Sequence, residues 1–370
     1  MPDQFKEVTR TSYGSKVKSS FGGVLIGLIL FVGSFVLLYW NEGRVDISNI
    51  AATATQIQAD ETNTDVEGNL VSAYGELKTE ENIGDDYLVE DNYVQLVRTT
   101  EMYSWIEEEE SETKTETGGS DVTETTYTYD TDWTSDPEDS SDFKYPEEHE
   151  NPNKSVDDKT VNNNKTYIGN YKIDTTKVDL PSLSEITLNE TNTILDAESE
   201  LVNSYIFIGE GTLSNPEVGD IRISYQALSP GADVTVFGKL DGTNISTYAD
   251  EDANTLYRVF NSTHEEALAT MHTEYVTSMW IFRAVGFIMM WIGLAMFLGP
   301  ISTILSFIPL LGKAGRGLIS IITFVIAAIL SILTILISMI LQSTVALVII
   351  GIVIVIAVIV VVMAIIKNKK

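Results

Sequence analysis

The sequence predicts a multi-pass α-helical membrane protein with four spans and a large β-rich (α+β) extracytoplasmic domain. Three observations lead to this fold class. Four apolar runs, three of them uncharged and one with a single charge, are each long enough to cross a bilayer. Nearly all acidic residues lie between the first and second runs. Basic residues flank the runs on the side that would face the cytoplasm.

The first run, residues 21–40, contains 20 uncharged residues, and a helix of that length crosses roughly 30 Å of hydrocarbon. It is too long for the apolar core of a cleaved signal peptide, so we expect an uncleaved anchor. The other runs predict spans at 279–298, 318–341 and 345–366. Residues 299–317 would form the loop between the second and third spans.

Orientation follows from the basic residues, which gather in three clusters: Lys6, Arg10, Lys16 and Lys18; Lys313 and Arg316; Lys367, Lys369 and Lys370. All three clusters fall on one side of a four-span chain, and the positive-inside rule assigns that side to the cytoplasm. We therefore expect a basic cytoplasmic N-terminus at 1–20 and a cytoplasmic tail at 367–370. The domain at 41–261 and the segment at 262–278 would lie on the opposite side.

The expected outer domain is a polyanion. Of the 53 Asp and Glu residues, 51 lie between Asn41 and Met279, where 13 Lys and Arg leave a net charge of −38. Such a surface repels nucleic acid, so we exclude a nucleic-acid partner. The chain has no cysteine, which excludes disulfides, thiol catalysis and zinc–thiolate sites. Its acidity also suits a high-salt environment.

Alternating apolar and polar residues predict strands in this domain, bounded by turn residues. The strand-like runs are Asn69–Leu77, Tyr87–Trp105, Thr123–Trp133, Tyr205–Ile208 and Asp220–Tyr225. Residues 71–77 and 234–240 resemble each other, with Gly75 and Gly238 at equivalent positions. The match is consistent with two small β-barrel-like units, and chance similarity of strand composition is the alternative.

Residues 262–278 predict an amphipathic helix, because Ser262 and Glu265 form a capping box before apolar residues at helical spacing. The helix is expected to continue into the span at 279–298. Arg283 is the charge inside that span, and we expect it to extend to the interface. Small residues that would allow close helix packing are Gly23, Gly27, Gly286 and Gly293.

Sequence motifs of enzymes are missing. There is no P-loop, dinucleotide fingerprint or nucleophile elbow, and His264 and His272 miss the spacing of a zinc helix. We therefore expect no catalytic residue, no cofactor and no metal. Two alternatives to a non-enzymatic protein stay open: a membrane-anchored hydrolase that uses two carboxylates of the outer domain, and a channel or transporter, which would need polar groups at membrane depth.

Several motifs resemble the transmembrane protein 43 (LUMA) family. They are Leu37–Arg44, which contains Trp40, Asn41, Glu42, Gly43 and Arg44; Met102–Glu107, with Met102, Tyr103, Trp105 and Glu107; the strand from Tyr127 to Trp133; Asn215–Asp220, with Asn215, Pro216, Gly219 and Asp220; and Arg283–Gly286. Together they extend over most of the chain.

The resemblance implies a self-associating membrane scaffold with one anchor helix, a large lumenal or extracellular domain and three C-terminal spans. Animal members of the family lie in the endoplasmic reticulum and inner nuclear membrane and bind emerin and lamins. The acidity and the β-branched final spans of this chain favour a prokaryotic plasma membrane. We therefore expect other membrane proteins and lipids as partners, and inner-nuclear-membrane partners only in a eukaryotic source.

The end of the first span combines an aromatic belt with a cation on the outer side of the membrane. Trp40 suits the headgroup layer, and Arg44 faces a domain rich in carboxylates. We expect Arg44 to pair with Glu42 or with a carboxylate of the domain. Contact with a lipid phosphate is the alternative.

Overall fold

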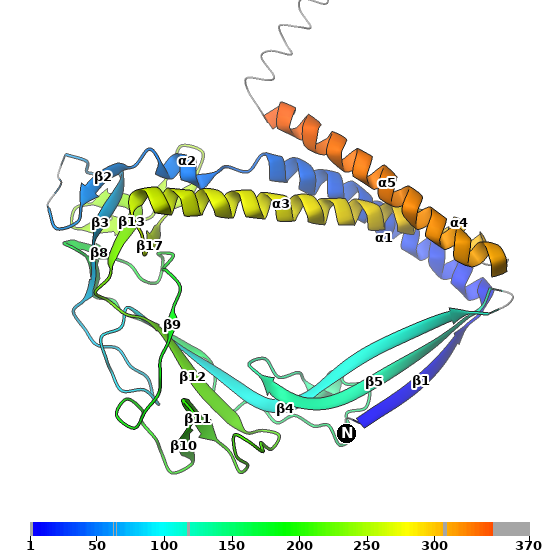
Figure 1. Cartoon of the computed structure of the whole chain (residues 1–370), viewed down its shortest axis with the longest axis horizontal. Coiled ribbons are helices and arrows are strands. Elements are labelled where there is room, and N and C mark those ends of the chain that lie inside the picture. The colour runs from blue at the N-terminus through cyan, green and yellow to red at the C-terminus, as the bar shows by residue number, and fades with distance from the viewer. Residues whose placement is uncertain (1–2, 62, 64, 117–118, 306–308, 343–370) are drawn as a thin grey trace, which may run out of the picture. The chain divides into compact units, whose positions relative to one another are not determined.

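The computed structural model describes residues 3–61, 63, 65–116, 119–305 and 309–342, which form two compact units. The sheet unit comprises Met1–Glu7, Asp46–Glu110 and Thr125–Thr273, and the helical unit comprises Val8–Val45, Ser111–Glu124 and Glu274–Lys370. Figure 1 labels their elements. The predicted span at 345–366 and the tail at 367–370 lie outside the described residues.

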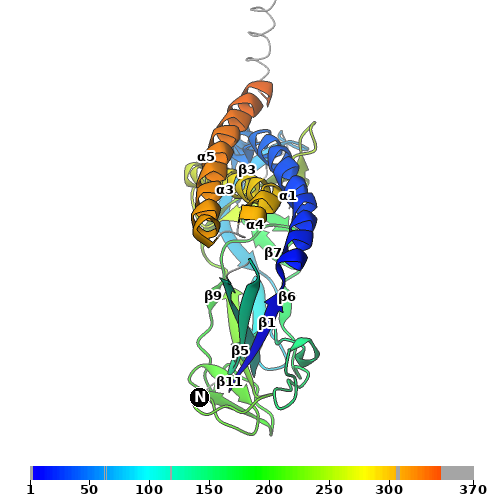
Figure 2. The ribbon, with the colours of Figure 1, turned by 90° about the vertical axis from the view of Figure 1, so that its right-hand side faces the viewer.

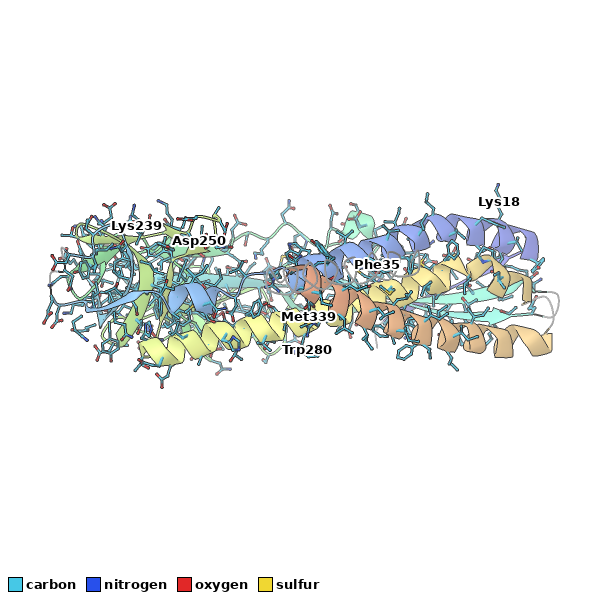
Figure 3. All side chains as sticks on the ribbon, turned by 90° about the horizontal axis from the view of Figure 1, so that it is seen from above. Lys18, Phe35, Lys239, Asp250, Trp280 and Met339 are labelled. Carbon is cyan, nitrogen blue, oxygen red and sulfur yellow. The ribbon has the colours of Figure 1, made fainter. Side chains whose placement is uncertain are left out.

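Three helices among the described residues are long and apolar enough to cross a membrane. They are α1 (Tyr13–Glu42), α3 (His264–Phe297) and α5 (Pro309–Gln342), and the short helix α4 (Gly299–Leu305) precedes α5. Within the helical unit the three long helices lie side by side (Figure 2). Their outward side chains are mostly large and apolar, as expected for helices surrounded by lipid (Figure 3).

The helices extend beyond the predicted spans, because backbone hydrogen bonding continues past the hydrocarbon layer. Helix α1 begins at Tyr13, and the described residues of the predicted loop 299–317 are all helical, in α4 and α5. The segments 262–278 and 279–298 form one continuous helix. Its capping box is shifted by one residue from the prediction, since Thr263 N–H donates to Glu266 Oε2 at 3.1 Å.

Small residues of α5 point toward the other helices, where Thr323, Ala327, Ser331 and Ser338 are buried. Ala327 joins Leu38 of α1 and Met290 of α3 in a core whose members are 0 % exposed. Small side chains let helix backbones approach and gain packing contacts that lipid cannot provide. The three helices therefore form one packed layer within the helical unit.

An eight-stranded sheet, most of which belongs to the sheet unit, has the order β1-β5-β4-β12-β11-β10, in which β6 also pairs with β4 and β9 with β12. The strands are β1 (Asp3–Thr11), β4 (Gln95–Thr115), β5 (Asp121–Thr134), β6 (Lys159–Asn162), β9 (Ser184–Glu185), β10 (Ser199–Val202), β11 (Tyr205–Ile208) and β12 (Ile221–Leu228). Alternate residues of β4 are buried from Leu96 to Ser104, as the predicted period of two requires.

A second sheet closes on itself as a five-stranded barrel. Its strands are β3 (Leu70–Thr79), β7 (Thr166–Ile168), β8 (Tyr171–Ile173), β14 (Asn244–Ser246) and β13 (Asp233–Asp241), and β13 pairs again with β3. Every pair is antiparallel except β8–β14. If the barrel strands are numbered 1 to 5 in chain order (β3, β7, β8, β13 and β14), neighbouring strands pair in the order 1-2-3-5-4-1, with one parallel pair between strands 3 and 5. This is the topology of the OB-fold.

The remaining elements are short. Strands β2 (Thr55–Gln58) and β17 (Arg258–Phe260) extend the barrel sheet, and β15 (Tyr248–Ala249) pairs with β16 (Thr255–Leu256). Helix α2 (Ile47–Ala51) and the 3-10 helix η1 (Ser140–Asp142) complete the described elements. The first turns of α3 pack on the barrel through Ala267 and Met271, which contact a core that contains Phe237.

The two similar heptads belong to one barrel and not to two. Residues 71–77 lie in β3 and 234–240 in β13, and these strands are antiparallel neighbours with Val71 opposite Gly238 and Gly75 opposite Val234. Both strands place apolar residues at alternate positions because both face the same core, which contains Val71, Ala73 and Leu77 of β3 and Val234, Val236 and Leu240 of β13. The prediction of two barrel-like units is therefore wrong for the described residues.

The N-terminal segment is a strand of the same sheet as the acidic hairpin β4–β5. Strand β1 pairs with β5, and within the helical unit Arg10 Nη2 lies 3.0 Å from Glu116 Oε1 and Lys16 Nζ 2.8 Å from Asp121 Oδ1. Residues 1–20 and 41–261 were expected on opposite sides of a bilayer. The side of the membrane on which each segment lies stays a prediction, and the contacts of Arg10 and Lys16 give it a direct test.

Candidate functional site: the junction of the end of helix α1 with helix α3

The end of α1 is tied to α3 by a two-pronged ion pair. Arg283 Nε lies 2.8 Å from Glu42 Oε1, and Arg283 Nη2 lies 2.7 Å from Glu42 Oε2. The side chains of Glu42 and Arg283 are only 3 % and 13 % exposed. Removing one member of such a pair leaves the other charge buried without a partner, which typically costs about 3–5 kcal/mol. The sequence assigned no partner to Arg283, and the structure gives it one in α1, while its extension to the interface stays a prediction.

Arg44 does not pair with Glu42. Its guanidinium carbon lies 5.6 Å from the ring centre of Trp40, 5.2 Å from that of Phe282 and 6.0 Å from that of Tyr275. Its backbone carbonyl accepts a hydrogen bond from the Tyr275 hydroxyl at 3.3 Å. Aromatic faces attract a cation through their quadrupole. The guanidinium of Arg44 thus lies against aromatic rings of α1 and α3. The residue that pairs with the Glu42 carboxylate is Arg283, not Arg44 as predicted.

Two further residues of the first motif contact other helices. Asn41 is fully buried, and its Nδ2 donates to the carbonyl of Met279 in α3 at 3.1 Å. A Cβ at Gly43 would lie 2.7 Å from Nε2 of Gln342, the last residue of α5. The C-terminal ends of α1 and α5 therefore meet the middle of α3 around residues 41–44.

The predicted packing glycines differ in how closely they are approached. A Cβ on Gly27 would lie 2.8 Å from the carbonyl oxygen of Gly293, and one on Gly293 would lie 2.6 Å from the backbone nitrogen of Phe31. A Cβ on Gly286 would lie 2.6 Å from Leu38 Cδ2. Gly23 has only an ordinary contact, 3.8 Å from Cε of Met296. The tight approach between α1 and α3 is therefore centred on Gly27 and Gly293.

The motifs of the sheet unit also lie next to each other. Tyr103 N–H donates to the carbonyl of Asp220 at 2.8 Å, and Gly219 N–H donates to the carbonyl of Tyr103 at 2.8 Å. Met102 is fully buried opposite Ile221. The segments 102–107 and 215–220 are thus neighbours across β4 and β12.

The turn before β12 is closed by its own motif residues. The Asp220 carboxylate accepts hydrogen bonds from Glu217 N–H at 2.7 Å and Glu210 N–H at 3.1 Å. Gly219 has φ +103°, which glycine adopts without strain. Asn215 N–H donates to the carbonyl of Thr212 at 3.0 Å, and Pro216 follows it. These residues fix a turn and line no described cavity.

Trp105 and Glu107 hold the segment after β5. The side chain of Asn151 bonds both the N–H of Trp105, at 2.7 Å, and its carbonyl, at 3.0 Å. Glu107 Oε2 accepts from Lys144 N–H at 2.7 Å and from the Tyr129 hydroxyl. Burial, followed by the hydrogen bond to Glu107, raises the pKa of Tyr129 to about 12.

A buried ionic cluster of the sheet unit was not predicted from the sequence. Asp85, only 1 % exposed, lies 2.7 Å from Arg98 and 2.7 Å from Lys159, and it accepts a hydrogen bond from Tyr225 at 2.8 Å. Burial alone would raise the pKa of Asp85, but the hydrogen bonds from Lys159 and Tyr225 and the charge of Arg98 hold it below its usual 3.8. Its oxygens are fully engaged, so the cluster stabilises the sheet and offers no free acid or base.

Other polar contacts were also missed. His272 Nδ1 lies 2.7 Å from Asp46 Oδ2, and His264 Nδ1 lies 2.8 Å from Ser72 Oγ. His149 is 1 % exposed and its ring stacks on Tyr129 at 3.9 Å. Each joins segments far apart in the sequence, for which the local pattern holds no signal.

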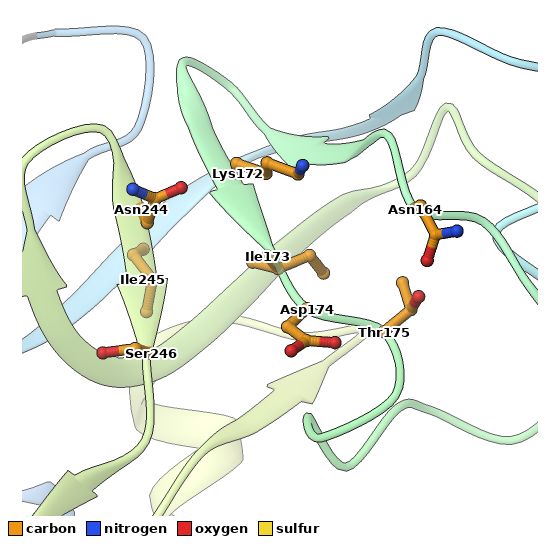
Figure 4. A pocket seen from close by; sticks show the side chains of 8 residues that line it. All are labelled: Asn164, Lys172, Ile173, Asp174, Thr175, Asn244, Ile245 and Ser246. Carbon is orange, nitrogen blue, oxygen red and sulfur yellow. The ribbon is translucent and has the colours of Figure 1, made fainter.

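A cavity of about 390 Å³ opens on the barrel. Figure 4 shows its lining, which consists of Asn164, Lys172, Ile173, Asp174, Thr175, Asn244, Ile245 and Ser246. Asp174 is the single carboxylate in this lining, whereas carboxylate-based glycoside hydrolysis needs two. Within the described part of the chain, no three His, Asp or Glu residues are grouped to hold a metal ion.

Comparison with known proteins agrees with the motif pattern. The family model described as Transmembrane protein 43 matches residues 102–344. Transmembrane protein 43 of Rattus norvegicus is 27% identical over 315 residues, which cover 80% of this chain and 78% of the relative. The Homo sapiens protein is 26% identical over 326 residues, covering 82% and 80%, and the Drosophila melanogaster homolog is 25% identical over 298 residues, covering 76% and 78%. No solved structure matches the chain. The chain therefore belongs to the transmembrane protein 43 family, as its motifs indicated.

Proposed function

We propose that this chain is a non-enzymatic membrane scaffold that self-associates and organises other membrane proteins and lipids. One observation carries the proposal: the motif residues typical of the family are used to join structural elements. Glu42, Asn41 and Arg283 join helices, and Tyr103 and Asp220 join strands. An enzyme would direct at least some of these side chains into a cavity.

The surface of α1 supports self-association. Leu25, Ile29, Val32 and Val36 are 65%, 63%, 52% and 63% exposed. They follow one another at intervals of four, three and four residues, the spacing of a helix–helix seam. We propose that a second copy packs on this stripe and that a fourth span at 345–366 completes the anchor. The membrane we propose is a prokaryotic plasma membrane, on the basis of the acidic composition.

A disulfide crosslinking experiment tests the proposed seam. The parent has no cysteine, so Ile29→Cys can be oxidised in native membranes without background. We expect a crosslinked dimer. Ile332→Cys is a matched control, because Ile332 lies on α5 and is 58% exposed, and it should crosslink much less. Equal yields at both positions would indicate random collision, and monomers at both would refute self-association through α1.

The wider scaffold role is tested by quantitative purification from native membranes. Membrane proteins that copurify with the unmodified chain should be reduced with Arg283→Gln, which leaves Glu42 unpaired but keeps the apolar surface. A hydrolytic activity that survives in purified protein and is lost on mutation of an outer carboxylate would instead favour the hydrolase.

A further inference from the structure

The barrel has its shortest strand pairing between β8 and β14, the single parallel pair. The β8–β14 pair registers only Asn244 with Lys172, whereas each antiparallel pair of the barrel registers three or more residue pairs. The cavity of about 390 Å³ is lined by both of these strands. Its size falls within the range of small-molecule sites.

The lining combines an apolar floor with polar groups at its rim (Figure 4). Ile173 and Ile245 are 1% and 2% exposed and belong to the barrel core. The side chains of Lys172, Asn164 and Ser246 line the same cavity. None of the three makes a side-chain hydrogen bond or ion pair among the described residues, so their donors and acceptors are free for a ligand.

The chemistry of the lining fits a neutral, hydroxyl-rich ligand. The lining contains one cation, Lys172, and one anion, Asp174, so its formal net charge is zero. Asp174 lies 3.1 Å from Lys177, which is outside the lining. The other polar members are amides and hydroxyls, which both donate and accept hydrogen bonds. A ligand with many hydroxyls and an apolar C–H face would match the rim and the floor together.

The position of the cavity agrees with this chemistry. Barrels of this topology bind oligonucleotides or oligosaccharides over their second and third strands and the adjoining loops. Here the third strand is β8, and Asn164 lies just before the second, β7. Oligonucleotides are excluded by the net charge of −38 between Asn41 and Met279. We propose that the cavity between β8 and β14 binds a neutral saccharide, a function that does not depend on the scaffold proposal.

Ligand-observed NMR on the full-length chain tests this site. The protein is held in a detergent without a sugar headgroup, and maltotriose, chitotriose and mannotriose are titrated separately. We expect saturable binding of at least one trisaccharide. Lys172→Ala and Asn164→Ala should each weaken it about three- to tenfold, the effect of losing one hydrogen bond. Lys114→Ala is the charge-matched control, because Lys114 lies outside the barrel and is 75% exposed, and it should bind like the parent.

Three results would overturn the proposal. The first is no saturable binding of any of the three trisaccharides. The second is binding that Lys172→Ala and Asn164→Ala leave unchanged while melting temperatures confirm that both variants are folded. The third is saturable binding of an oligothymidylate in place of the sugars, which would assign the cavity to single-stranded nucleic acid.

Discussion

Gly27 of α1 and Gly293 of α3 face each other with no room for a side chain at either position. Gly27→Ala should therefore force the helices apart and lower the stability of the protein in detergent by about 1–3 kcal/mol, as overpacking does. Gly22→Ala is the matched control, since nothing lies within 4 Å of a Cβ at Gly22. It should be neutral or stabilising because alanine favours helix. Thermal unfolding measures both, and equal effects would refute close packing at Gly27.

The N-terminal ion pairs predict which residues share a side of the membrane. Since Lys16 contacts Asp121 and Arg10 contacts Glu116, single cysteines at Ser12 and Ser120 should react with an impermeant thiol reagent from the same side. Such labelling would mean that α1 does not carry the N-terminus across the bilayer. Labelling from opposite sides would agree with the positive-inside pattern and would show that these ion pairs do not form in the membrane.

The buried cluster predicts a pH-dependent effect of Asp85→Asn. The folded-state pKa of Asp85 lies below its usual 3.8, so its stabilisation is present above that value and is lost as pH falls through the folded-state pKa. At pH 7 the substitution should cost about 3–5 kcal/mol, because Arg98 and Lys159 lose a buried partner. The difference from the parent should shrink below about pH 4. Chemical denaturation at several pH values measures it.

Asp86→Asn provides the comparison for the same cluster. Asp86 also lies near Arg98 and Lys159 but is 70% exposed, and exposed ion pairs contribute only about 0–1 kcal/mol. A loss at Asp86 as large as that at Asp85, or a loss at Asp85 that does not change with pH, would contradict the account of the cluster.

The net charge predicts a salt effect on the whole chain. Repulsion at −38 opposes compaction, and the Debye length falls from about 10 Å at 0.1 M salt to about 3 Å at 1 M. The melting temperature of the detergent-solubilised protein should therefore rise in molar potassium chloride. A melting temperature independent of salt would show that the acidic groups are already neutralised by their local partners.

Local patterns were sufficient for the membrane helices and for much of the sheet. Apolar runs predicted the cores of α1, α3 and α5, and the period of two in Tyr127 and Tyr129 predicted a buried face of β5, where the two side chains are 8% and 0% exposed. These signals are local because the bilayer thickness determines the length of each apolar run and the pleat determines the side-chain period within each strand.

Contacts between distant segments could not be predicted in this way. Arg283 was treated as an isolated charge because its partner Glu42 lies 241 residues away. His149 lies between the predicted strands in a stretch of polar residues, yet it is buried against Tyr129. The similar heptads were real, but composition cannot distinguish two neighbouring strands of one barrel from two repeated barrels.

The central claim is that the family motifs join structural elements, and the Glu42–Arg283 pair tests it most directly. Glu42→Arg and Arg283→Glu each bring like charges together and should each lower stability by about 3–5 kcal/mol. The double variant restores an opposite pair at the same positions. We expect thermal unfolding in detergent to show that the double variant recovers most of the loss. If the double variant loses as much stability as the two single variants together, the claim is contradicted.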